Sequence, residues 1–148
     1  MLHKVVTIPN LVKLWKGTYG DGHPLPEGTG EYIIPSHIWE LIGKETVAAV
    51  KAIPLTFVSA LQNIHLDPQF YTAEAWSFWF IFLAPYLLKG RFRKNKYYTH
   101  MLQLVEILKM VLQFDITRAH VQLLRARVID YVKDFEKYSL INNMLFMH

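Results

Sequence analysis

The sequence predicts an all-α protein, a helical bundle of about five to six helices that follows a Gly/Pro-rich N-terminal loop. Apolar residues recur at helical spacing through residues 35–140, and no strand-like alternation of useful length follows residue 34. Ser, Thr and Pro stand where several of these helices would begin. At 148 residues, with 52% hydrophobic and 19% charged residues, the chain has the length and composition of one folded domain.

The chain divides into four segments. Residues 1–16 form a short N-terminal element, which the pattern leaves open as helix or strand, and residues 17–34 form the Gly/Pro-rich loop. This loop contains neither GxxxxGK[ST] nor GxGxxG, so a surface loop is favoured over a phosphate-binding one. Residues 35–140 form the helical domain, and 141–148 form a divergent C-terminal tail.

The first two helices of this domain are predicted between residues 36 and 65. Ser36 is expected to be the N-cap of a helix that is loosened at Gly43 and continues to Ile53. Pro54 suits the first turn of a short second helix, because its missing N–H would have no partner there. This second helix is expected to end near His65.

The third helix carries the most apolar stretch of the chain. Thr72 is expected to cap it, with Glu74 in its first turn and Gly90 as its terminator. The apolar part, 75–88, has only fourteen residues, whereas a membrane span needs about 20, so no span is expected. Because the stretch is apolar all round, we expect burial on most sides, against the two helices that follow. Its large side chains are Trp76, Phe78, Trp79, Phe80, Phe82 and Leu83.

Two long helices are predicted after it. The first spans about 94–114, and the second follows it and ends at about residue 138. Asp115 and Thr117 are candidate caps of the last one. The apolar stripe of the first is Tyr98, Met101, Leu102, Val105, Leu108 and Leu112. The stripe of the second is Val121, Leu124, Val128, Tyr131 and Phe135.

A basic stretch separates the apolar helix from these two. It contains five of the sixteen Lys and Arg residues and no acid: Lys89, Arg91, Arg93, Lys94 and Lys96. One interpretation is a helix end and loop in water. The other is a contact with the phosphates of DNA, which clustered cations can make without reading sequence.

No pattern in the chain predicts catalysis, a metal or a cofactor. Cysteine is absent, the histidines lack HxxxH or HExxH spacing, and no serine stands in GxSxG. The acids form no paired cluster and are expected at caps and on surfaces. The first residues show no cleavable signal pattern, since Lys4, Pro9 and Lys13 interrupt them, so we expect an intracellular protein.

Five blocks of the chain resemble those of a known family: LVKLWKGTY (11–19), GEYIIPSHIWELIGKET (30–46), AIPLTFVSALQNIHLD (52–67), YTAEAWSFWFIFLAPYLLKGRF (71–92) and KYYTHMLQLVEILKMVLQFDIT (96–117). The family is that of the fungal transposase-derived proteins related to CACTA-type elements. In such transposases, acidic residues on an RNase H-like sheet hold two Mg²⁺ ions. The region that resembles this chain lies downstream of that sheet, so the resemblance carries over no catalytic residue.

The resemblance therefore implies a non-catalytic helical fragment of a transposase-like protein. It would serve as a scaffold segment in the nucleus, associate with the rest of a transposase or with itself, and contact DNA weakly through residues 89–96. The alternative is a free-standing helical domain that binds protein through exposed aromatic residues.

Overall fold

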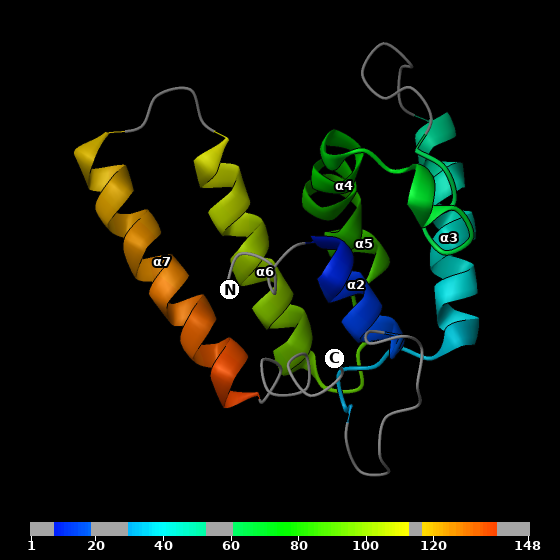
Figure 1. Ribbon diagram of the computed structural model, residues 1–148, viewed down its shortest axis with the longest axis horizontal. Helices are drawn as coiled ribbons and strands as arrows, with labels where there is room; N and C mark the ends of the chain where they lie inside the picture. Colours follow the sequence, from blue (N-terminus) through cyan, green and yellow to red (C-terminus); the bar gives the residue numbers. More distant parts are fainter. Residues whose placement is uncertain (1–7, 19–29, 53–60, 113–116, 139–148) are drawn as a thin grey trace.

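The computed structural model describes residues 8–18, 30–52, 61–112 and 117–138 (Figure 1). Within these ranges the protein is an all-α bundle of five helices without a strand, which confirms the predicted fold class. The helices are α2 (Ile8–Lys16), α3 (Ser36–Lys51), a composite of α4 (Ala73–Phe78), η2 (Trp79–Leu83) and α5 (Ala84–Leu87), then α6 (Asn95–Val111) and α7 (Arg118–Lys137). A short 3₁₀ turn, η1 (Pro68–Phe70), precedes the composite helix. In Figure 1, α6 and α7 lie side by side at one edge, α3 lies at the other, and α2 and the composite helix lie between.

Several sequence predictions fall wholly or partly outside the described residues. These are residues 1–7 of the N-terminal element, residues 19–29 of the loop predicted at 17–34, the end of the first helix at Ile53, the start of the second helix at Pro54, the Asp115 cap and the tail at 141–148. The N-terminal element, left open between helix and strand, is helical from Ile8 to Lys16.

Helix α2 buries one face and holds the segment that leads into α3. Leu11, Leu14 and Trp15, spaced at three and four residues, are almost completely buried. The carbonyl of Trp15 accepts a hydrogen bond from the Ile34 amide at 2.8 Å and another from the Trp39 indole at 3.4 Å. Because this carbonyl lies in the last turn of α2, the end of one helix also positions the start of the next.

The N-cap of α3 differs from the predicted one. Pro35 occupies the cap position with φ −58° and ψ 152°, and Ser36 is the first helical residue, with no side-chain cap bond. The Pro35 carbonyl already accepts from the amides of Ile38 and Trp39. Since the proline ring fixes φ near the helical value, the helix begins directly behind it, and Ser36 is too late in the chain to cap it.

Gly43 does not loosen α3, which is continuous through it. A Cβ built on Gly43 would lie 2.0 Å from Asn63 Oδ1, so the missing side chain makes room for Asn63. That oxygen accepts from the amides of His65 at 3.0 Å and Leu66 at 3.1 Å. This local turn competes with a helix, so the prediction that helix extends to His65 is wrong for residues 61–65.

The composite helix begins as predicted and is interrupted in its middle. Thr72 Oγ1 accepts from the Ala75 amide at 3.2 Å, which confirms the predicted cap. In η2 the Ala84 amide bonds to the Trp79 carbonyl, five residues back, which makes a π-helical turn. Pro85 follows directly and has no N–H to continue the α-helical ladder, so the wide turn lies where regular bonding is lost.

The composite helix is buried over most of its surface and exposed along one side. Trp79, Phe80 and Leu88 are fully buried, whereas Phe82 is 56% and Tyr86 82% exposed. Elements α2, α3 and α6 pack against it, and α7 packs on α6 instead. The prediction of burial on most sides is therefore confirmed, although Phe82 lies on the exposed side. The predicted packing against both following helices is confirmed for α6 and wrong for α7. No helix within the described ranges is long and apolar enough to cross a membrane.

The buried face of α6 is rotated from the predicted stripe, whereas α7 buries the last part of its predicted stripe and exposes the first. Met101 and Val105 are buried as expected, but Leu112 is 60% exposed, and on α7 Val121 and Val128 are 51% and 40% exposed. The buried residues of α6 are Tyr97, His100, Met101, Leu104, Val105, Ile107 and Met110, and those of α7 are Tyr131 and Phe135. Apolar residues surround most of α6, so its own periodicity leaves the choice of buried face open.

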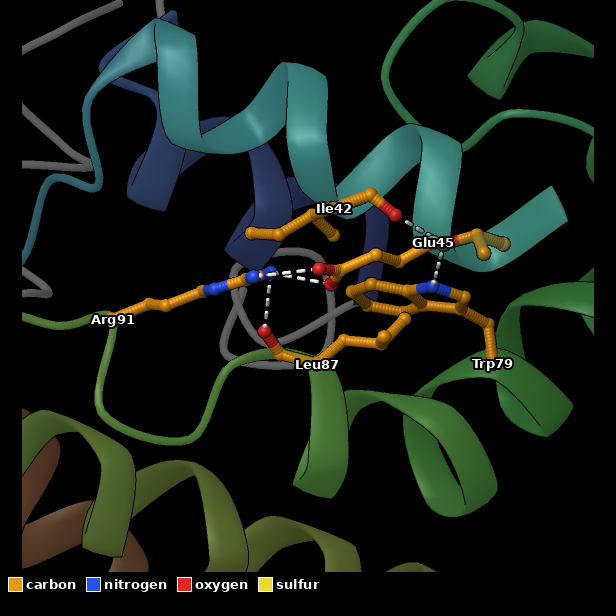
Figure 2. Close-up of polar contacts among 6 residues, drawn as sticks. Ile42, Glu45, Trp79, Leu87 and Arg91 are labelled. Carbon is orange, nitrogen blue, oxygen red and sulfur yellow. Dashed lines mark hydrogen bonds and ion pairs between the residues drawn. The ribbon is translucent and has the colours of Figure 1, made fainter. Parts of the chain in front are cut away.

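A buried polar chain joins the composite helix to α3 (Figure 2). The Trp79 indole N–H donates to Thr46 Oγ1 at 3.1 Å, and the Thr46 hydroxyl donates to the Ile42 carbonyl at 2.8 Å. Trp79, Thr46 and Ile42 have no exposed surface. Each buried donor in this chain has an acceptor, which is what a buried indole and hydroxyl require.

Replacement of Trp79 by Ala should leave the protein largely unfolded. Large-to-small changes at a buried Trp cost about 3–5 kcal/mol, which is most of the stability of a marginal domain. Phe82→Ala, on the exposed side of the same helix, should change the melting temperature little. Thermal melts followed by circular dichroism measure both, and a cooperative melt of Trp79→Ala at the wild-type temperature would contradict the central role of this helix.

Gly43→Ala should destabilise the protein although Ala favours helices. The new Cβ would displace the Asn63 side chain and break its two backbone hydrogen bonds, at a cost of about 1–3 kcal/mol. In an Asn63→Ala background the clash is absent, so the same Gly43→Ala change should be neutral or stabilise by up to about 1 kcal/mol. Denaturant unfolding of the four proteins gives the coupling, and additive effects would exclude the proposed contact.

Candidate functional site

The basic stretch predicted as a DNA contact is the connection between α5 and α6. Gly90 adopts φ +73°, the left-handed conformation that glycine tolerates, and turns the chain after the helix ends at Leu87. Leu88 and Phe92 are buried on either side of this turn. The connection is therefore held to the core by two buried side chains, Leu88 and Phe92, and its cations lie between and after them.

Arg91 turns back from the connection toward α3 (Figure 2). Its guanidinium donates to both oxygens of Glu45, at 2.7 and 2.8 Å, and also to the Leu87 carbonyl at 3.0 Å. This two-point pairing with the carboxylate holds the pKa of Glu45 below its ordinary value and raises that of Arg91. The side chain of Arg91 is 24% exposed, so its charge is used mainly inside the protein.

Lys94 and Lys96 also have intramolecular partners. Lys94 Nζ lies 2.9 Å from Glu31 Oε1, and the Tyr97 hydroxyl donates to Glu31 Oε2 at 3.3 Å. The Lys94 hydrogen bond is the main reason that the pKa of Glu31 is lowered, and burial, with the charge of Glu31, raises that of Tyr97 to about 12. Lys96 Nζ lies 5.0 Å from the ring centroid of Tyr97 and 5.1 Å from that of Tyr138.

Lys89 and Arg93 are the two remaining cations of the stretch. Both are exposed, and neither forms an ion pair with a residue in the described ranges. Four of the five predicted residues thus lie on the connection and Lys96 lies in the first turn of α6, but three of the five contact Glu31, Glu45 or aromatic rings. Lys89 and Arg93 are therefore the exposed cations of the stretch that have no such intramolecular contact among the described residues.

The acidic side chains of the described ranges show no grouping suited to a metal. No three His, Asp or Glu residues there come together in a way that could hold an ion. Glu106, for example, lies 3.5 Å from Lys109 and 3.8 Å from Arg127 on the surface of the α6–α7 pair. Such contacts are those of a solvated helix face.

His100 is the one almost completely buried histidine among the described residues. It is 3% exposed, its Nε2 lies 3.1 Å from the Tyr131 carbonyl, and its ring stacks on that of Tyr131 with centroids 4.2 Å apart. Burial lowers the pKa of His100, so the neutral ring is favoured. His100 therefore joins α6 to α7 and does not face an open site.

Two hollows lie on the surface of the described residues. One, of about 370 Å³, is lined mainly by the composite helix, including Phe78, Ile81 and Phe82. The other, of about 430 Å³, lies between α2 and the segment from η1 to α4, and it contains Lys13 and Lys16. These two lysines were not predicted as site residues, because the pattern of residues 1–16 allows a helix or a strand. Their spacing of three within LVKLWK places them on one face once the segment is a helix.

Comparison with known proteins identifies no relative of this chain. No family model, no curated protein and no solved structure matches the chain. Its function must therefore be inferred from its own residues and contacts.

Protonation of His100 should weaken the protein below pH 6.5, the ordinary pKa of histidine. Because the pKa is lower in the folded state, the unfolded chain binds protons first, and the free energy of unfolding falls as pH drops below 6.5. His100→Phe keeps the ring contacts with Tyr131 and should reduce this pH dependence. His37→Gln, at an exposed position on α3, should keep it; equal slopes in melts of His100→Phe and wild type would contradict the assignment.

Proposed function

We propose that this chain is a non-catalytic helical scaffold segment of a fungal transposase-like protein, which contacts DNA weakly and without sequence preference through Lys89 and Arg93. The resemblance of blocks 30–46 and 71–92 supports the transposase-like part of this proposal. The all-α fold is the one that the resemblance implies for such a segment.

The observation that carries the scaffold role is that cations of the basic stretch form ion pairs within the protein. Arg91 pairs with Glu45, forty-six residues earlier, and Lys94 pairs with Glu31, sixty-three residues earlier. These pairs connect the α5–α6 connection to α3 and to the segment before it. Cations held in such pairs are less available to phosphates, because binding DNA would first have to break the pair.

The DNA contact that remains is small. With Lys89 and Arg93 as its main contacts, about two phosphates are neutralised, and each contributes about 0.9 to the slope of log affinity against log salt. Affinity should therefore be low at physiological salt. Such a contact fits a segment that adds to the DNA grip of a larger protein rather than one that finds DNA by itself.

The double variant Lys89→Ser/Arg93→Ser tests this division of roles. It should weaken binding to duplex DNA and reduce the salt slope by up to about 1.8, with an unchanged melting temperature. The matched variant Arg91→Ser/Lys94→Ser removes the same charge but breaks both ion pairs, so it should lower the melting temperature and affect DNA binding less. Filter-binding titrations at several salt concentrations and thermal melts give both readouts.

Two results would contradict the proposal. Unaltered affinity and salt slope in Lys89→Ser/Arg93→Ser would exclude the DNA contact. An unchanged melting temperature in Arg91→Ser/Lys94→Ser would exclude the scaffold role of the basic stretch.

A second candidate, a free-standing helical protein-interaction domain, is favoured by one further observation. Apolar side chains at the end of α6 and the start of α7 are about half exposed: Val111 50%, Leu112 60%, Val121 51% and Leu123 46%. Exposed apolar residues near one end of a helix pair are typical of protein contacts. Sedimentation separates the two functions, since self-association that rises with protein concentration and ignores salt would favour the second.

A further inference from the structure

The hollow of about 430 Å³ has a lining unlike the rest of the surface. Lys13 and Lys16 of α2 lie along it, Thr18 and Gln69 add polar groups, and Tyr71 and Trp76 form its aromatic part. Its described lining contains no acidic side chain. The volume lies within the range of about 300–1,000 Å³ that small-molecule sites occupy.

Lys16 is a cation without a counter-ion in the described ranges. Its ammonium has only the Ile64 carbonyl, at 3.4 Å, and the face of the Trp39 ring, at 5.3 Å from the centroid. Burial lowers the pKa of Lys16 to about 8, and no nearby carboxylate opposes that effect. The charge of Lys16 in turn contributes to the lowered pKa of His65, after the larger effect of burial.

This position therefore costs stability at neutral pH. A charged amine held partly out of water without an acid is less favourable than an unbranched apolar side chain of similar length, such as Met. Groups kept in such an environment are typical of binding sites, where a ligand supplies the missing charge. An anion is the ligand that Lys16 lacks.

Lys13 reinforces this demand. It lies three residues before Lys16 and so on the same face of α2, and its side chain is exposed at the hollow. A phosphate or carboxylate can accept hydrogen bonds from both ammonium groups.

The aromatic part of the hollow is held rigid. The rings of Tyr71 and Trp76 lie 5.0 Å apart, and the Tyr71 hydroxyl donates to the Gln62 carbonyl at 2.5 Å. Trp76 is also set edge-on against the buried Trp79, at 6.4 Å between centroids. A fixed aromatic surface beside two cations suits a ligand with a flat ring.

We propose that this hollow binds a small ligand in which a planar ring carries a phosphate or carboxylate group. The anionic group would lie against Lys13 and Lys16, and the ring against Tyr71 and Trp76. Adenosine monophosphate and salicylate present this shared chemistry with a phosphate and a carboxylate respectively. The site is built from α2, η1 and α4, and it includes no residue of the basic stretch at 89–96.

Calorimetric titration with these two compounds tests the proposal. At least one should bind the wild-type protein with saturation, and adenosine alone or inorganic phosphate alone should bind at least about tenfold more weakly. Lys16→Met should lower the affinity by about tenfold or more, and it should raise the melting temperature at pH 7 because the unpaired charge is gone. Lys13→Gln, at an exposed position, should lower the affinity without disturbing the core.

Two control variants separate this site from a general attraction to anions. Lys133→Met, exposed on α7, removes the same charge and should leave affinity and melting temperature unchanged. Lys89→Ser/Arg93→Ser should bind the probes as the wild type does, so the result does not depend on the DNA contact. The inference is overturned if neither probe binds at millimolar concentration, or if Lys16→Met and Lys13→Gln bind with wild-type affinity. A fall in the melting temperature of Lys16→Met would overturn the argument that Lys16 is uncompensated.

Discussion

The structure depends on one buried hydrogen bond, from the indole N–H of Trp79 to the hydroxyl of Thr46. This N–H has no water to bond, so the ring can be buried only where a polar group faces it, and Thr46 provides that group on α3. Thr46 is satisfied in turn by the Ile42 carbonyl. This requirement fixes the rotation of the composite helix against α3, which a purely apolar contact would specify less strictly.

Other features follow from that rotation. With Trp79 turned toward α3, Phe82 faces outward and Leu88 faces inward, so the connection that follows begins at the core. Arg91 then comes within reach of Glu45, one residue before Thr46 on α3 (Figure 2). The Trp79–Thr46 hydrogen bond thus joins the composite helix to α3, and the Arg91–Glu45 ion pair joins the connection behind that helix to α3. The bidentate pair at the edge is solvent-accessible and contributes less than the buried indole.

The lysines and arginines of the chain fall into different electrostatic situations. Arg91 and Lys94 have carboxylate partners, whereas Lys89 and Arg93 are hydrated on the surface. Lys16 has no carboxylate partner among the described residues and is only partly hydrated, and burial lowers its pKa to about 8. A paired cation stabilises the fold, a hydrated one is free to meet a phosphate, and an uncompensated one favours a ligand that brings negative charge.

The sequence by itself determined that the protein is helical and where several helices begin and end. Thr72 and Thr117 cap helices as predicted, because a cap bond joins residues only three apart and is written in the local sequence. The same locality explains why α6 and α7 were found within a few residues of their bounds. The basic stretch could also be recognised from the sequence, because a cluster of cations is a property of local composition.

Only the tertiary structure decided which faces are buried and which charges are free. The outward side of Phe82, the exposed Val121 and the room that Gly43 leaves for Asn63 depend on residues far away in the chain. The partners of Arg91 and the isolation of Lys16 depend on them equally. The physical reason is that helix periodicity and capping act over one or two turns, whereas burial, ion pairing and pKa shifts depend on what the fold places opposite each side chain.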